Sequence, residues 1–202
     1  MSREQLIFFA VLIPSVILHE VSHGWVALMF GDDTAKKAGR LTLNPIAHID
    51  PFGTIILPLI LVLSHAGAFG YAKPVPVNPR NLRNPRNQSV LVSLAGPAVN
   101  VTLSVAAALG LHAIGVLGND LLHEVVFGIG YINVILAAFN LIPLPPLDGS
   151  AVVERVLPRQ WWPQYLRLRQ YSFGLLLIVV LLWRNGLNSF FLWALHLWSH
   201  LL

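Results

Sequence analysis

The sequence predicts an all-α polytopic membrane protein, a bundle of about five to six transmembrane helices with a small membrane-embedded β-hairpin or re-entrant region. The first observation is compositional: of 202 residues, 55% are hydrophobic and 11% are charged, and the mean hydropathy is +0.67. Soluble domains carry about 25% charged residues. The second observation is that long uncharged runs alternate with short basic segments, as in helices that cross a bilayer and the loops between them.

Charge and cysteine content limit the partners and the chemistry. The net charge of +4 and the pI near 9.9 come from basic residues that lie between apolar runs, so we expect the lipid bilayer and no nucleic acid as a partner. The absence of cysteine excludes disulfides and a thiol nucleophile. The length predicts one domain over residues 1–202, with a core over 5–155 and C-terminal helices over about 168–202.

Three segments are predicted to cross the membrane as single helices: 5–30, 89–117 and 121–141. At 1.5 Å per residue the first is about 39 Å long, more than the ~30 Å hydrocarbon core. The second contains no charged residue, and a short turn joins it to the third. The remaining predicted elements are an amphipathic interfacial segment and two short spans, at 150–169, 171–183 and 187–202.

Two shorter segments predict irregular structure within the membrane. The segment Arg40-Leu41-Thr42-Leu43-Asn44 alternates in polarity and precedes Pro45, which predicts a short strand or hairpin whose edge could hold an extended peptide. A plain polar connection is the alternative. Residues 52–69 are apolar but interrupted by Pro58, and both flanks are basic. The positive-inside rule therefore favours a re-entrant segment that returns to the cytoplasmic side.

The run His19-Glu20-Val21-Ser22-His23 lies inside the first predicted helix. A helix turns once in about 3.6 residues, so imidazoles four residues apart share a face and can reach one ion. Glu20 follows the first histidine, where zinc hydrolases carry their general base. Ionisable groups in a spanning segment cost ~2.5 kcal/mol or more each and are functional by default. The alternative is a polar pair buried inside the bundle.

Asp148 is a candidate third ligand. The prolines at 143, 145 and 146 end the preceding helix, so Asp148 is delivered on irregular backbone, which at membrane depth must face protein or water. Two imidazoles and one carboxylate leave the fourth position that catalytic zinc sites keep open. The alternative is that Asp148 caps a helix that begins near Ser150.

The metal site and the basic loops demand the same topology. If 52–69 crossed the membrane, the helices 5–30 and 121–141 would run in opposite directions and their C-terminal ends would face opposite leaflets. Metal ligands must lie about 2 Å from the ion, so the two ends must meet. A re-entrant 52–69 lets both helices run the same way. We therefore predict a site in the cytoplasmic half of a multi-pass cytoplasmic-membrane protein.

With these pieces assembled, residues 6–155 resemble the site-2 protease family of intramembrane zinc metalloproteases. The resemblance rests on HEVSH at 19–23, GRLTLNPIAHIDPFGT at 39–54, YAKPVPVNPRN at 71–81, AGPAVN at 95–100 and FNLIPLPPLDG at 139–149. It implies one zinc ion per chain held by His19, His23 and Asp148, activation of water by Glu20, and a membrane-embedded strand region at about 40–45 that holds substrate. Asn100 and Asn140 match positions that assist substrate or intermediate binding. The chain departs from larger members in having no room for a PDZ or CBS domain.

The predicted activity is zinc-dependent hydrolysis of a peptide bond in or next to a transmembrane segment of a membrane-protein substrate. An amide inside an intact helix is sheltered, so the substrate must unwind locally and bind extended. The alternative is a catalytically silent protein that binds or transports a metal ion, although the helices 89–117 and 121–141 supply few polar residues for a permeation path. A structural scaffold would leave Glu20 and Asp148 unexplained. The sequence leaves the oligomeric state open.

Overall fold

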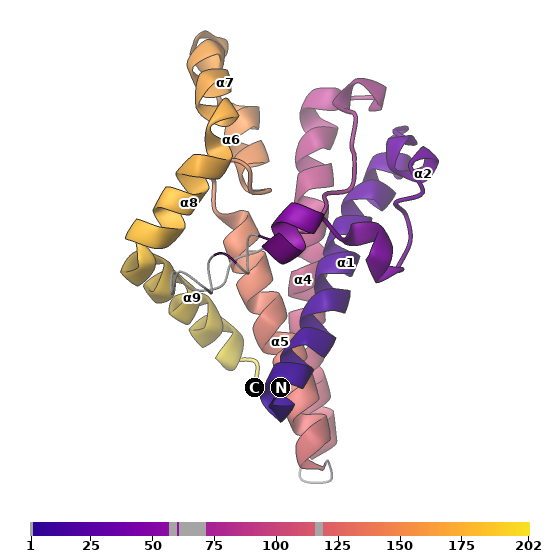
Figure 1. Cartoon of the computed structure of the whole chain (residues 1–202), viewed down its shortest axis with the longest axis vertical. Coiled ribbons are helices and arrows are strands. Elements are labelled where there is room, and N and C mark those ends of the chain that lie inside the picture. The colour runs from indigo at the N-terminus through magenta and orange to yellow at the C-terminus, as the bar shows by residue number, and fades with distance from the viewer. Residues whose placement is uncertain (1, 57–59, 61–71, 116–118) are drawn as a thin grey trace.

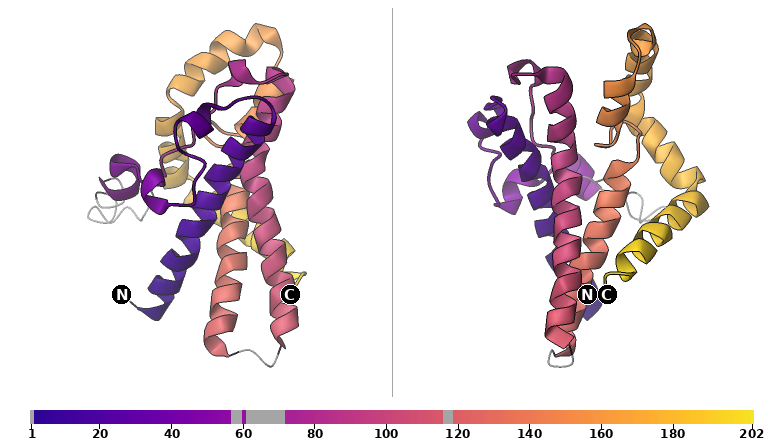
Figure 2. Two further views of the ribbon diagram at one scale, coloured as in Figure 1. Left: turned by 90° about the vertical axis from the view of Figure 1, so that its right-hand side faces the viewer. Right: turned by 180° about the vertical axis from the view of Figure 1, so that it is seen from behind.

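The protein is built around three long helices. The computed structural model describes residues 2–56, 60, 72–115 and 119–202. In it α1 (Arg3–Met29), α4 (Pro85–Ile114) and α5 (Asp120–Leu141) pack against one another. α1 and α5 run in the same direction and α4 runs against them (Figure 1). From the side, α1 crosses the α4 and α5 pair at an angle (Figure 2, left).

These three helices are each long and apolar enough to cross a membrane, so the helices predicted at 5–30, 89–117 and 121–141 are confirmed to within a few residues as candidate spans. Their starts have local causes. The Ser2 side chain accepts a hydrogen bond from the Gln5 backbone N–H in a capping box, and Asn119 Oδ1 accepts from the Leu122 N–H. Pro85 occupies the first turn of α4, where no intrahelical N–H bond is lost.

The bundle has its polar residues inside and its large apolar residues outside. Phe9 and Leu109 are 47% and 64% exposed, whereas Asn100 and Asn133 are completely buried. Small residues such as Ala108 fill the helix contacts. In water this distribution would expose a large apolar surface, which is unfavourable. Lipid solvates such a surface and favours polar groups that face inward. The chain is therefore an integral membrane protein.

The C-terminal part of the chain forms a second group of helices beside α5 (Figure 2, right). α9 packs on α5, where the Trp198 indole covers Gly130 and its Nε1–H donates to the Ser104 carbonyl at 2.8 Å. Both termini lie toward the same end of the molecule (Figure 1). The four helices of this group are α6 (Ser150–Val156), α7 (Trp162–Gln170), α8 (Ser172–Leu182) and α9 (Arg184–Ser199).

The number of crossings is lower among the described helices than predicted. α8 has 11 residues and α9 has 16, fewer than the ~20 of a simple span. α7 and α8 meet at 69°, and counting them as one broken span raises the candidates from three to four. The predicted total of five to six spans stays a prediction.

Residues 40–44 do not form the predicted strand. The Arg40 N–H donates to the Ala35 carbonyl at 2.9 Å, and the Asn44 side chain caps the short 3-10 helix η1 (Pro45–His48). The His48 Nε2 lies 2.9 Å from the Thr42 carbonyl oxygen. These local bonds close the loop on itself, so its backbone is not paired with another strand. The described part of the chain contains no β-strand.

The predicted re-entrant segment 52–69 is described only in part. Its first residues belong to the short π-helix η2 (Pro51–Ile56), residue 60 is helical, and the other positions lie outside the described residues. After the gap the chain continues as the extended segment 72–78, followed by η3 (Pro79–Asn81). The Lys73 N–H donates to the His48 carbonyl at 2.9 Å, so the two flanks of this segment lie next to each other.

Asp32 is a buried carboxylate that ties the end of α1 to the loop before α4. It accepts the Asn78 backbone N–H at 2.6 Å, the Asn81 amide at 2.9 Å and the Thr34 backbone N–H at 3.1 Å, together with the Thr34 hydroxyl. Burial by itself raises the pKa of Asp32, but these donors favour the ionised form more strongly, and the resulting pKa is lower than usual.

We expect Asp32 to make the fold acid-sensitive. Because its pKa is lower in the folded than in the unfolded state, its contribution to stability is complete above the unfolded value of about 4 and is lost as the pH falls through the folded pKa. Asp32→Asn should lower the free energy of unfolding by roughly 1–3 kcal/mol at pH 7 and flatten the decline in acid. Thermal unfolding in detergent at pH 7 and pH 3 measures both effects. Asp33→Asn, at a partly exposed carboxylate paired with Lys37, is the control, and equal acid sensitivity of both variants would contradict the assignment.

Candidate metal centre

His19, His23 and Asp148 meet inside the bundle. One ligand atom from each lies within 4.8 Å of the others. Asp148 Oδ2 is 3.1 Å from His19 Nε2 and 3.4 Å from His23 Nε2, and the two Nε2 atoms are 3.2 Å apart. Both histidines are less than 10% exposed. The three residues that the sequence singled out as candidate ligands are therefore brought together.

Each of these side chains is positioned by local geometry. The two histidines project from one face of α1, and their rings meet edge to face with centroids 4.8 Å apart. The loop after α5 folds back because the Gly149 N–H donates to the Asn140 carbonyl at 2.7 Å. A Cβ at Gly149 would lie 2.3 Å from the Leu141 carbonyl oxygen, so only glycine fits this turn. Gly149 is also the N-cap of α6, with no side-chain cap, and the alternative that Asp148 caps this helix is wrong.

The hydrogen bonds of the two Nδ1 atoms show which imidazole nitrogen carries the proton and which faces the centre. His23 Nδ1 lies 2.7 Å from the Val92 carbonyl oxygen, and His19 Nδ1 lies 2.6 Å from Asn100 Oδ1. Both partners are oxygen acceptors, so in the neutral rings Nδ1 carries the proton and Nε2 keeps its lone pair.

The three inward atoms form a set that fits a cation. Two Nε2 lone pairs and the Asp148 carboxylate repel one another at these distances unless a positive charge lies among them. Asp148 Oδ2 is buried and has no hydrogen-bond partner in the described protein. Two imidazoles and a carboxylate are ligands that zinc prefers in catalytic sites. On this observation the residues present fit a bound zinc ion.

Gly96 allows α4 to pass directly over the two imidazoles. A Cβ at this position would lie 2.5–2.6 Å from His19 Cε1, His19 Nε2 and His23 Nε2, closer than any real contact. The small size of Gly96 therefore permits close helix approach at the metal centre itself.

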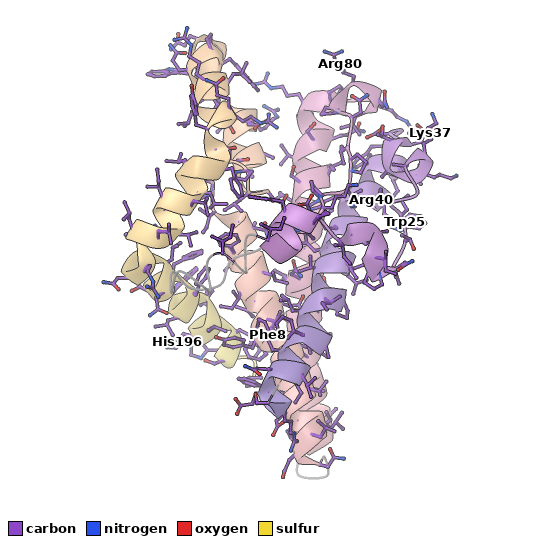
Figure 3. The ribbon with its side chains drawn as sticks, viewed as in Figure 1. Phe8, Trp25, Lys37, Arg40, Arg80 and His196 are labelled. Atoms are coloured by element: carbon purple, nitrogen blue, oxygen red, sulfur yellow. The ribbon has the colours of Figure 1, made fainter. Side chains whose placement is uncertain are left out.

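Glu20 is held by the extended segment that follows the undescribed residues. Its Oε2 accepts the Val75 backbone N–H at 2.9 Å. Arg40 in turn holds this segment, since its buried guanidinium donates to the Lys73 carbonyl at 2.6 Å. Figure 3 shows Arg40 beside α1, while Lys37 and Arg80 extend from the end of the molecule. The sequence did not indicate Val75, because its contribution is a backbone amide and no side-chain pattern marks it.

A pocket of about 470 Å³ lies beside the centre. His19, Glu20 and Asn140 line it together with apolar side chains from α1, α5 and α8, including Phe139, Phe173 and Leu176. Asn140 is thus brought to the same pocket as Glu20, and its Nδ2 donates to the Leu136 carbonyl at 3.0 Å.

The other predicted substrate-binding residues lie elsewhere in the described structure. Asn100 is completely buried behind His19. Within the segment 40–44, Arg40 is buried, Leu43 is 63% exposed, and none of the five residues is among those that line the described pocket. Leu41 instead packs beside Val75 over Gly24 of α1.

Comparison with known proteins gives a consistent set of matches. A family model described as "Peptidase family M50" matches residues 7–120 and 116–182. The chain is 42% identical over 189 residues to "Putative zinc metalloprotease YwhC" of Bacillus subtilis (strain 168), covering 90% of this chain and 82% of that protein. It is 31% identical over 187 residues to "Putative zinc metalloprotease Rip2" of Mycolicibacterium smegmatis, covering 92% of this chain and 70% of that protein.

A more distant relative is "Zinc metalloprotease MJ0392" of Methanocaldococcus jannaschii, 21% identical over 155 residues, which cover 77% of this chain and 35% of that protein. No solved structure matches the chain significantly. The family match extends over nearly the whole region that contains α1, α4, α5 and the candidate metal centre. The chain therefore belongs to Peptidase family M50, the site-2 protease family of zinc-dependent intramembrane proteases.

Proposed function

We propose that this chain is an intramembrane endopeptidase in which His19, His23 and Asp148 hold one zinc ion and Glu20 is the general base. The observation that carries the proposal is the convergence of three lone-pair atoms inside an apolar bundle, with Glu20 lining the adjacent pocket. When bound, zinc supplies Lewis-acid activation of water and of the scissile carbonyl.

Glu20 moves the proton in this proposal. One carboxylate oxygen stays bonded to the Val75 N–H, which leaves the other to take a proton from the attacking water. The water oxygen bonds to the carbonyl carbon, the C–N bond breaks, and the proton passes from Glu20 to the departing amine. His19 and His23 keep their protons on Nδ1 throughout and donate them to Asn100 Oδ1 and to the Val92 carbonyl.

We propose that the pocket beside the centre receives an unwound stretch of a substrate's transmembrane segment. Its walls include Val16, Leu136 and Leu147, which suit the apolar side chains of such a segment. Asn140, which lines this pocket, would contact this stretch. The predicted role of residues 40–44 as an edge for the substrate stays a prediction. We also assign Arg40 to the support of the segment that carries Val75.

We also propose that the centre lies in the cytoplasmic half of the cytoplasmic membrane and that 52–69 is re-entrant within a single domain. Support comes from the parallel run of α1 and α5 (Figure 1) and from the bond between the flanks of this segment, Lys73 N–H to the His48 carbonyl. The basic residues Lys37 and Arg80 lie at one end of the molecule (Figure 3), as the positive-inside rule requires.

Cysteine labelling tests this topology cleanly because the chain has no cysteine of its own. Arg80→Cys in intact cells should react with a membrane-permeant maleimide and resist an impermeant one, whereas Glu124→Cys, at the opposite end of the bundle, should react with both. Exclusive labelling of position 80 from outside would overturn the assignment.

Zinc removal tests the activity. The purified chain, reconstituted in liposomes with a peptide that contains one transmembrane segment, should cleave that peptide, lose at least 90% of the rate after treatment with a strong chelator, and recover on addition of zinc. A metal transporter would instead move zinc into the liposomes and leave the peptide intact. Cleavage at an undiminished rate after complete metal removal would refute the proposal.

A further inference from the structure

A chain of buried amides crosses the bundle behind the candidate metal centre. Asn100 of α4 and Asn133 of α5 are both completely buried. Asn100 Nδ2 donates to Asn133 Oδ1 at 2.7 Å, and Asn133 Nδ2 donates to the Ile129 carbonyl at 2.8 Å and to Ser15 Oγ at 2.9 Å. At the other end of the chain is His19 Nδ1, 2.6 Å from Asn100 Oδ1.

The donor and the acceptor in every hydrogen bond of this amide network follow from the Ile129 carbonyl at one end. A backbone carbonyl only accepts, so Ile129 requires the NH₂ of Asn133 to face it. The Oδ1 of Asn133 then faces Asn100. Asn100 must therefore donate from its NH₂ to this oxygen, and its own Oδ1 faces His19. An oxygen at this place makes Nδ1 of His19 the donor, and the lone pair stays on Nε2, the atom that faces Asp148.

We infer that Asn133 is a positioning residue of the metal centre, which acts through Asn100 to hold His19 in the tautomer that can bind zinc. This inference rests on the proposed role of His19 as a ligand. Asn133 touches neither the centre nor the pocket beside it, and it lies in an apolar helix with no local motif around it.

The two histidines differ in how their tautomers are held. The Nδ1–H of His23 donates to a backbone carbonyl, Val92, which cannot turn round. The partner of His19 is a side-chain amide, and rotation of that amide by 180° would present NH₂ to Nδ1 and move the proton to Nε2. Without Asn133, nothing among the contacts described for Asn100 prevents this rotation, so His19 alone depends on a third residue.

Zinc affinity measures the effect directly, without reference to cleavage. In competition with a chromophoric chelator in detergent, Asn133→Ala should bind zinc about 10–100-fold more weakly, the usual cost of losing support around a metal-binding histidine. Asn133→Leu fills the space with apolar atoms and should show the same loss of affinity. It is the variant to use if Asn133→Ala folds poorly. Ser104→Ala removes a buried hydroxyl, one turn from Asn100, that donates only to the Val101 carbonyl among its described contacts. This variant should bind zinc as the wild type does.

A rescue experiment separates positioning from general stability. Asn100→Asp introduces an ionised group that only accepts, so His19 Nδ1 must donate to it whatever occupies position 133. In the Asn133→Ala background this change should restore zinc affinity to within about threefold of the wild-type value, while the thermal stability stays low. Affinity that is unchanged in Asn133→Ala and Asn133→Leu, or that falls equally in Ser104→Ala, would overturn the inference.

The His19→Ala variant distinguishes failure of the inference about Asn133 from failure of the proposed ligand set. If it loses zinc while Asn133→Ala and Asn133→Leu retain wild-type affinity, the inference about Asn133 is wrong and the metal centre stands. If it binds zinc as tightly as the wild type, the proposed ligand set itself is wrong and the inference falls with it.

Discussion

We expect Glu20→Gln to abolish cleavage while the chain keeps its zinc. A glutamine has nearly the same shape and still offers an oxygen to the Val75 N–H, so the pocket and the three candidate ligands are expected to stay in place. It has no carboxylate to take a proton from water. Loss of a general base lowers kcat by about 10²–10⁴-fold, and we expect the larger figure because the proposed mechanism uses Glu20 on both the attacking water and the leaving amine.

The measurement is turnover of a transmembrane peptide in liposomes, with zinc content determined on the same preparation. Glu124→Gln is the matched control, because Glu124 lies at the other end of the bundle, where it pairs with Arg3 at 3.0 Å. It should cleave at the wild-type rate. Retained turnover in Glu20→Gln would show that another group is the base.

We expect Asp148→Asn to remove both zinc and activity. The amide keeps the size of the carboxylate but loses the negative charge that balances the ion among two neutral imidazoles. We expect zinc affinity to fall by more than the roughly 10–100-fold that changes in supporting residues cause, and cleavage to disappear at ordinary zinc concentrations. His23→Ala should give the same result.

Zinc per chain, measured after dialysis, tests this expectation. Asp120→Asn changes an exposed carboxylate in the first turn of α5, far along the helix from the centre, and should retain one zinc per chain. Stoichiometric zinc in both Asp148→Asn and His23→Ala would mean that the ion is held elsewhere.

The sequence by itself determined the features that depend on local periodicity. Long apolar runs predict α1, α4 and α5 because a bilayer admits little else. The spacing of His19 and His23 predicts a shared face because helix geometry is constant. Pro143, Pro145 and Pro146 predict that Asp148 leaves the helix, since proline removes the backbone donor.

Only the tertiary structure decided which groups meet across helices. The sequence indicates Arg40 as a candidate for substrate contact. In the structure its guanidinium donates to the Lys73 carbonyl, in the segment that carries Val75. Residues 40–44 alternate like a strand, but local hydrogen bonds close them into a loop. Asn133 is an isolated amide in an apolar helix, and its partner Asn100 is distant in sequence. Such contacts depend on the rotation and packing of whole helices, which no short stretch of sequence encodes, because each helix can bury more than one face until its neighbours are in place.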